Sequence, residues 1–392
     1  MAEKAAAPNV ASLPSTNKVS LRELANFFLR LGITAFGGPA AHIGMMEGEL
    51  VRRRQWLSRE KFLDLLGASN LMPGPSSSEL AIHIGYLLAG WAGLLVAGTC
   101  FILPAAMMVA ALAWAYVHFG KLPEASAILF GVKPVVVAVI LQALWGLGRT
   151  AVKTAFLGVV GTLSLLLAFL GLHPLLVLAL AGSAVCLTSL RSLRLPVAAV
   201  PFAVPTAALA GAATSFSLGS LLLVFLKVGA VVFGSGYVLL AFLRADLVVH
   251  RGWVTDSQLV DAIAVGQVTP GPVFTTATFI GYLLGGIPGA VVATVGIFLP
   301  AFLLVAVSGP LVPRIRKSKI ASAFLDGVNV GSLALMGAVT WELGRASRVG
   351  VVTVLLLVAS LIALLRFRAN SGWLVLIGAI VGLITNGFHP RW

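Results

Sequence analysis

The stretch from Asn70 to Tyr86 reads NLMPGPSSSELAIHIGY, and a close copy from Gln267 to Tyr282 reads QVTPGPVFTTATFIGY. Pro73 and Pro75 donate no backbone hydrogen bond and restrict the residues before them, so an arriving helix must end there. The second copy repeats the same Pro-Gly-Pro break. Two copies of one broken-helix device predict one site that is built from two halves of the chain.

A new helix is expected directly after each break. In the first copy it begins with Ser76, Ser77 and Ser78, and in the second copy Thr275 and Thr276 supply the hydroxyl groups. The first turn of a helix has unpaired N–H groups and the positive end of the helix dipole. Hydroxyl groups beside such a turn suit an anion, so we predict an anion site at the two breaks.

The composition is that of a membrane protein. Of 392 residues, 59% are hydrophobic and 10% are charged, with a mean hydropathy of +1.02. The apolar runs are long and continuous, such as residues 94–119 and 351–365, which favours spanning helices over barrel strands. We therefore predict an all-α polytopic membrane protein in which each half has about five to six hydrophobic segments.

The chain is a tandem repeat. At an offset of 197 residues the identities include Gly32 with Gly229, Trp56 with Trp253, and Asp64 with Asp261, and after the Pro-Gly-Pro triplets the match continues at an offset of 196. We predict a disordered tail over residues 1–19, a first repeat over 20–195, a linker over 196–216 and a second repeat over 217–392.

Loop charges predict that the two repeats are inverted. The early loop of the first repeat contains Arg52, Arg53, Arg54, Arg59 and Lys61, whereas its counterpart in the second repeat contains only Arg251, with Arg244 a little upstream. The bias is reversed in the later loops, where the first repeat has Lys121 alone and the second has Arg314, Arg316, Lys317 and Lys319. Because basic loops stay in the cytoplasm, the two early loops should lie on opposite sides of the membrane. The chain has 27 Lys and Arg against 13 Asp and Glu. Cytoplasmic loops account for this basic excess, so we predict no nucleic acid as a partner.

The topology of each Pro-Gly-Pro segment has two interpretations. The charge pattern requires an odd number of crossings between Lys61 and Lys121, yet two apolar segments, residues 62–91 and 93–119, lie between them. A re-entrant hairpin with its tip at the triplet solves this count, because broken backbone is tolerated at that depth when protein buries it. A kinked span is the alternative.

Several residues are candidates for the site. Arg30 and Lys227 occupy equivalent positions on apolar helices, where a cation is functional by default or snorkels to the interface. Gly37, Gly38 and Gly234 would loosen the first helix of each repeat or serve tight packing. The predicted substrate-binding set also includes Asn70, Gln267, Pro73, Gly74, Pro75, Ser76, Ser77, Pro270, Gly271, Pro272 and Thr275.

Glu79 is the candidate for proton coupling. It lies one helical turn before His83 on the helix that leaves the first break, and Thr276 replaces it in the second repeat. The pattern Ser76-x-x-Glu79 also matches a capping box, which would make this carboxylate structural. No hydrolase elbow, zinc pair or nucleotide phosphate loop is present, so we predict no enzyme and no cofactor.

In combination, these motifs resemble the chromate ion transporter family in its long, duplicated form. The resemblance extends over almost the whole chain after residue 20 and rests on FGGPA at 36–40, Trp56, MPGP at 72–75, FGxG at 233–236 and TPGP at 269–272. It implies a secondary transporter in the cytoplasmic membrane that exports chromate and confers resistance, driven by protons or by anion exchange. From the residues alone, a sulfate-type oxyanion permease and a non-transport membrane scaffold stay open, and an oligomer is compatible with the sequence.

Overall fold

The computed structural model describes residues 19–36, 38–70, 72–120, 122–192, 216–232, 238–308, 319–346, 350–367, 369 and 371–387. Nearly all of the predicted tail and linker, and the basic loop at 314–317, lie outside these residues. The described residues form helices and contain no strand, which confirms the all-α prediction.

The helices of the two repeats follow one another in the same order. The first repeat contains α1 (Leu21–Thr34), α2 (Gly38–Met46), η1 (Glu47–Arg53), α3 (Arg59–Ser69), α4 (Ser76–Phe119), α5 (Pro123–Ala151), α6 (Ala155–Phe169) and α7 (Pro174–Ser192). The second contains α8 (Leu218–Val231), α9 (Leu239–Leu243), η3 (Arg244–His250), α10 (Asp256–Val268), η4 (Val273–Thr275), α11 (Thr276–Ser308), α13 (Lys319–Ala346), α14 (Val351–Phe367) and α15 (Ser371–Gly387).

Equivalent hydroxyl residues start equivalent helices. Ser20 caps α1 by accepting a hydrogen bond from the N–H of Glu23, and Ser217 caps α8 in the same way through Ser220. Ser58 and Thr255 cap α3 and α10. A cap satisfies one of the N–H groups that a helix leaves unpaired at its start. The sequence repeat is therefore also a repeat of local structure.

The longest helices each contain a sharp turn. In α4, Ala89 and Gly90 leave the helical region, and Gly90 has φ 62° and ψ −146°. In α11, Gly285 and Gly286 do the same, with φ 60° and ψ −147° at Gly286. Positive φ is available to glycine at little steric cost. The arm from 76 to 88 is thus a short helix of its own, and the arm from 91 to 119 is long enough to cross a bilayer.

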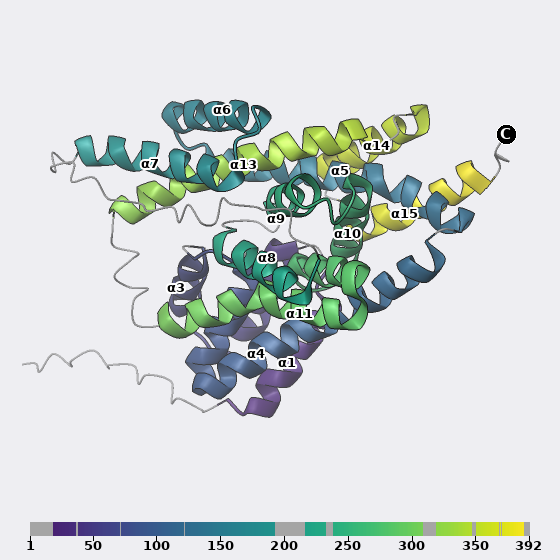
Figure 1. The fold of residues 1–392 in the computed structure, drawn as a ribbon. Helices are drawn as coiled ribbons and strands as arrows, with labels where there is room; N and C mark the ends of the chain where they lie inside the picture. Colours follow the sequence, from purple (N-terminus) through teal and green to yellow (C-terminus); the bar gives the residue numbers. More distant parts are fainter. Residues whose placement is uncertain are drawn as a thin grey trace, which may run out of the picture.

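The repeats exchange their C-terminal helices. In Figure 1, one layer contains α1, α4, α8 and α11, and the other contains α5, α13 and the short helices that accompany them. In this second layer α5 packs against α14 and α15 of the second repeat, and α13 packs against α6 and α7 of the first. The C-terminal helices of each repeat therefore pack against a helix of the other repeat.

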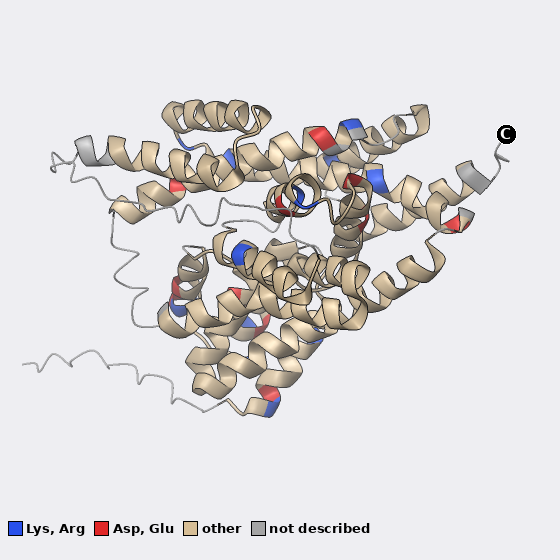
Figure 2. Cartoon of the chain, viewed as in Figure 1, with Lys and Arg blue, Asp and Glu red and all other residues tan. Residues whose placement is uncertain are grey.

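The surface is suited to lipid. Four of the described helical segments, residues 76–119, 124–151, 273–307 and 320–342, are long and apolar enough to span a membrane. Large apolar side chains lie exposed on these and neighbouring helices, including Trp91 and Val307, and Figure 2 shows few charges along the ribbon. Exposed apolar area of this extent is expected where the solvent is a bilayer. The chain is a multi-pass membrane protein.

Candidate site at the two helix breaks

The two Pro-Gly-Pro tips are bonded to one another's repeats. The N–H of Gly74 donates to the carbonyl of Val232 at 2.7 Å, and the N–H of Gly271 donates to the carbonyl of Ala35 at 3.0 Å. Ala35 and Val232 are the fully buried residues at which α1 and α8 end. Since a buried donor without a partner is costly, each tip requires the other repeat. That the two breaks form one substrate site stays a prediction.

Both tips have backbone conformations that suit glycine. Gly74 has φ +138° and Gly271 has φ +92°. A methyl group at Gly271 would lie 2.6 Å from Cβ of Ala105, and one at Gly74 would meet the Glu79 carboxylate. The flanking Pro75, Pro270 and Pro272 are buried, and Pro73 is half-buried.

His42 holds the first break together. Its ring is fully buried, with Nε2 3.2 Å from the carbonyl of Ala35 and Nδ1 3.2 Å from Oγ of Ser77. The carbonyl can only accept, so Nε2 carries the proton and Nδ1 accepts from the Ser77 hydroxyl. The carbonyl of Ala35 thus receives bonds from both His42 and Gly271. Sequence reasoning missed His42 because the second repeat has Leu239 at the equivalent position.

Three polar side chains at the start of α4 are buried. Ser78 and Glu79 are fully buried and His83 is 3% exposed. Within the described part of the chain, Oγ of Ser78, both carboxylate oxygens of Glu79 and Nε2 of His83 have no hydrogen-bond partner. Natural proteins leave few such groups, and those that persist are often functional.

The capping-box interpretation of Glu79 is wrong. Pro75, not a serine, is the N-cap residue of α4, and no side chain caps this helix end. A proline at this position leaves no backbone N–H for the carboxylate to accept from, so the reciprocal bond of a capping box cannot form.

The hydroxyl groups of the second break are occupied by backbone. Thr275 donates to the carbonyl of Pro272 at 2.7 Å, and Thr276 donates to the carbonyl of Val273 at 2.8 Å. A hydroxyl has one proton to donate, so these two groups must leave a carbonyl before they can bind an anion. The two breaks, which look alike in sequence, therefore differ in available donors.

The two amides also differ. Asn70 ends α3 and is exposed, whereas Gln267 lines a small cavity of about 10 Å³ together with Thr276. The other lining residues are apolar and come from α5, α9, α10 and η4. A space of this size holds about one water molecule.

The two candidate cations have different surroundings. Nζ of Lys227 lies 2.7 Å from Oδ1 of Asp246, which is 5% exposed. Arg30 lies on the exposed face of α1, opposite the face that packs against α4. Asp246 was missed because its repeat equivalent, Glu49, belongs to the basic early loop.

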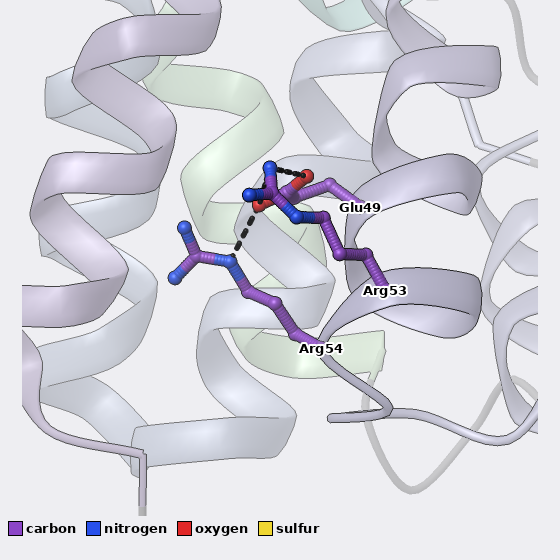
Figure 3. A network of polar contacts seen from close by, with 3 residues as sticks. All are labelled: Glu49, Arg53 and Arg54. Atoms are coloured by element: carbon purple, nitrogen blue, oxygen red, sulfur yellow. Dashed lines mark hydrogen bonds and ion pairs between the residues drawn. The ribbon is translucent and has the colours of Figure 1, made fainter.

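Glu49 makes local pairs in that loop. Its carboxylate lies 2.8 Å from Nε of Arg54 and 3.2 Å from Nη1 of Arg53 (Figure 3). The hydrogen bond from Arg54 and the charge of both guanidinium groups hold the pKa of Glu49 below its ordinary value.

Gly38 begins α2 with φ +73°, whereas Gly37 and Gly234 lie outside the described residues.

A second ionic cluster joins the repeats. Lys133 on α5 pairs with Asp261 on α10 at 3.1 Å, and the hydroxyl of Tyr116 on α4 donates to the same carboxylate at 3.0 Å. Sequence reasoning used Asp261 only to align the repeats. The apolar run around Lys133 was a signal, because a lone cation in a span is a functional candidate.

Known proteins share this organisation in sequence. A family model described as chromate transporter matches the chain twice, over residues 22–186 and 219–383. The chain is 33% identical over 381 residues to a probable chromate transport protein of Synechococcus elongatus, covering 93% of this chain and 95% of that protein. It is 34% identical over 382 residues to a chromate transport protein of Cupriavidus metallidurans, covering 93% of both.

A chromate transport protein of Pseudomonas aeruginosa is 36% identical over 346 residues, which cover 83% of this chain and 82% of that protein. No solved structure matches the chain.

Proposed function

The chain belongs to the chromate transporter family, and we propose that it is a secondary transporter that exports chromate across the cytoplasmic membrane. Beyond family membership, we propose the direction of transport, its energy source and the residues that bind the substrate. Relatives named as chromate transport proteins support chromate as the substrate.

The reciprocal bonding of the two tips is the observation that carries this proposal. Gly74 bonds to Val232 and Gly271 bonds to Ala35. If one Pro-Gly-Pro segment moves, it must therefore break its bond to the other repeat or move that repeat with it. Repeats with broken helices that meet at a shared site are typical of secondary transporters, in which one repeat rocks against the other. We propose that the two repeats are inverted in the membrane and that the tips form the substrate site.

The charge of the substrate motivates the roles of Arg30 and Lys227. Chromate is a dianion, and each helix N-terminus offers about half a positive charge, so two of them leave about one negative charge to be balanced. Lys227 is paired with Asp246, and Arg30 is exposed, so both must change surroundings to meet the substrate. We propose that they do so during the transport cycle.

Glu79 is the proposed proton-coupling residue. Its carboxylate is fully buried, lies against the backbone of Gly74 and has no hydrogen-bond partner among the described residues. Movement of the Gly74 tip would change the surroundings of this carboxylate and so its affinity for a proton. A proton that binds there as the anion moves would connect transport to the proton gradient.

Everted membrane vesicles test the proposal directly. Export from the cell appears as uptake into everted vesicles, so energised vesicles that contain the protein should accumulate labelled chromate, and vesicles without it should not. A protonophore that abolishes uptake indicates proton coupling, whereas uptake that depends on preloaded anion indicates exchange. Labelled sulfate is the second substrate in the same assay, because it is also a tetrahedral dianion.

Transport of sulfate with exclusion of chromate would make the protein a sulfate permease. Transport of neither anion would contradict a transporter of oxyanions and favour a scaffold. Lys153→Gln serves as the control variant, because its partner Asp326 is partly exposed and Lys153 is 59% exposed, so the variant should fold and transport normally.

A further inference from the structure

We infer that Asp261 holds the place of a substrate oxyanion between the two repeats, and that an arriving oxyanion displaces its carboxylate from Lys133 and Tyr116. This inference rests on the proposed function. It assigns a second oxyanion site that lies on α10, away from the two helix breaks.

The donors come from one repeat and the acceptor from the other. Lys133 on α5 and Tyr116 on α4 belong to the first repeat, and Asp261 on α10 belongs to the second. Oδ1 of Asp261 lies 3.1 Å from Nζ of Lys133, and Oδ2 accepts from the Tyr116 hydroxyl at 3.0 Å. Lys133 donates a hydrogen bond to Oγ of Ser257 at 2.9 Å, whereas Oδ1 of Asp261 accepts no hydrogen bond from the described residues, so Lys133 and Asp261 form an ion pair. The carboxylate is 2% exposed.

These donors suit an oxyanion as well as they suit a carboxylate. A lysine ammonium and a tyrosine hydroxyl both donate to anionic oxygen, and charge-assisted bonds of this kind are the strong ones. A dianion attracts Lys133 more strongly than the single charge of Asp261. The carboxylate therefore occupies a preformed cradle for which a more highly charged anion can compete.

Lys133 needs an anionic partner at every stage. It lies within residues 124–151, one of the segments that are apolar and long enough to span the membrane. A cation in such a segment is costly unless it is paired. Breaking its bond with Asp261 is therefore favourable only when another anion takes the place of the carboxylate, which connects separation of α5 and α10 to anion binding.

The cluster is connected to the second helix break. Helix α10 packs against α5, and it contains Asp261 about two turns before Gln267. Gln267 lines the small cavity with Thr276 and with Ile140, which follows Lys133 by two turns on α5. Helices α5 and α10 therefore connect the ion pair to the residues that flank the second break.

The arrangement occurs in one repeat only. Asp64 is the equivalent of Asp261 on α3 and is exposed, and the residue equivalent to Lys133 is Asn329. The cluster is therefore not a consequence of the repeat, because these equivalent positions do not keep the lysine.

Oxyanion binding to purified protein tests the inference separately from transport. Affinities for sulfate and for chromate are measured by thermal shift and by equilibrium binding. Asp261→Asn leaves Lys133 and Tyr116 without the internal anion, so affinity should rise about tenfold while transport slows. Lys133→Gln and Tyr116→Phe should each lower affinity about tenfold, because each removes a donor to the charged oxygen atoms of the anion.

Two matched controls should leave the affinity unchanged. Lys153→Gln removes another lysine that pairs with an aspartate of the opposite repeat, with Nζ 2.7 Å from Oδ1 of Asp326, but in an exposed place. Asp64→Asn changes the equivalent aspartate of the first repeat. If Asp261→Asn and Lys133→Gln bind oxyanions as the parent protein does and only melt at lower temperature, the pair is structural and the inference is overturned.

If the single variants fold poorly, the double variant Lys133→Met, Asp261→Leu provides the test. Apolar residues often replace a buried ion pair without loss of stability. The double variant should fold and bind oxyanions at least tenfold more weakly, and parent-like affinity would overturn the inference. A parent protein that binds oxyanions with the expected variant pattern but does not move chromate contradicts the proposed function alone. Chromate transport with unchanged affinities in the variants contradicts the inference alone.

Discussion

The two repeats have the same backbone conformation at the turns of α4 and α11 and the same bonding at their tips, but different side chains around the two breaks. The turns at Gly90 and Gly286 agree within 2° in φ and 1° in ψ, and both tips bond to the opposite repeat. In contrast, the first break is surrounded by His42, Ser78 and Glu79, and the threonines of the second break are bonded to backbone. The two breaks therefore share their backbone bonds and differ in the polar side chains around them.

One ion pair shows this divergence with particular clarity. Glu47 and Arg59 lie 3.8 Å apart in the first repeat, and the residues at the same two positions of the second repeat are Arg244 and Asp256, 2.7 Å apart. The positions of the pair are kept and the signs are exchanged. Arg244 also pairs with Glu342.

The largest expected loss of stability is at the Gly271 tip, and it should exceed the loss at the Gly74 tip. Gly271→Ala adds a methyl group 2.6 Å from Cβ of Ala105 at a φ of +92°, so steric strain and overpacking together should cost about 3 kcal/mol. Gly74→Ala meets the Glu79 carboxylate, which is the end of a flexible side chain, so the main loss should be the backbone strain of a φ of +138°, about 1–3 kcal/mol. Thermal stability in detergent measures both.

Equal losses of stability in these two variants would contradict the asymmetry. The double variant Gly74→Ala, Glu79→Ala gives the sharper control, because removing the carboxylate should relieve the Gly74→Ala strain in part. The pair Gly271→Ala, Glu79→Ala should show no such relief, since Gly271 does not face that side chain.

The next effect concerns the two equivalent cations. Lys227→Gln leaves the buried carboxylate of Asp246 without its partner, and loss of one member of a buried pair costs about 3 kcal/mol. Arg30→Gln changes an exposed side chain and should alter stability by less than about 0.5 kcal/mol. Under the proposed function both variants also weaken chromate binding, and Arg30→Lys should be milder than Arg30→Gln.

Parent-like chromate affinity in both glutamine variants would remove Arg30 and Lys227 from the site and leave them as residues that snorkel to the interface. Lys227→Gln combined with Asp246→Asn separates the two roles, since it should recover stability without recovering affinity.

Much of the fold could be predicted from sequence, because prolines, glycines and helix caps act locally. The triplets at 73–75 and 270–272 fix the breaks, and matching residues 197 apart reveal the repeat. The partners of a side chain depend on packing between distant segments, which sequence spacing does not encode. Lys227 and Asp246, or Lys133 and Asp261, therefore became visible as pairs only in the structure. His42 had no repeat equivalent to draw attention to it.

Glu79→Gln is expected to alter transport with little change in stability. The two side chains have nearly the same shape, and no hydrogen bond of the described residues is lost. If Glu79 exchanges the coupling proton, the variant should have a pH profile of chromate transport that is flat where the parent profile slopes. Thr276→Val at the second break is the matched variant, and it should retain the slope. An unchanged profile in Glu79→Gln would exclude Glu79 as the coupling residue.

The smallest effect is expected at Glu49, which is the first repeat's equivalent of Asp246. Its folded-state pKa is lowered by the Arg54 hydrogen bond, so its contribution to stability is present above the ordinary carboxyl pKa and is lost as pH falls through the lowered value. For a pair near the surface this amounts to about 0.2–1 kcal/mol. Glu49→Gln should melt slightly earlier than the parent at pH 7 and equally at pH 3.

A larger loss at pH 3 than at pH 7 would mean that the carboxylate acts through contacts other than Arg53 and Arg54. High salt provides the control, because screening should reduce the difference at pH 7.

Inversion of the repeats is the central claim, and the sidedness of two equivalent positions tests it most directly. Arg53 and His250 are 197 residues apart, both are exposed, and both lie in the early loop of their repeat. With Cys100 and Cys186 replaced by serine, single cysteines at these positions are labelled with a reagent that does not cross the membrane. The account predicts labelling of Arg53→Cys from the cytoplasmic side only and of His250→Cys from the outside only. Labelling of both from the same side would contradict it.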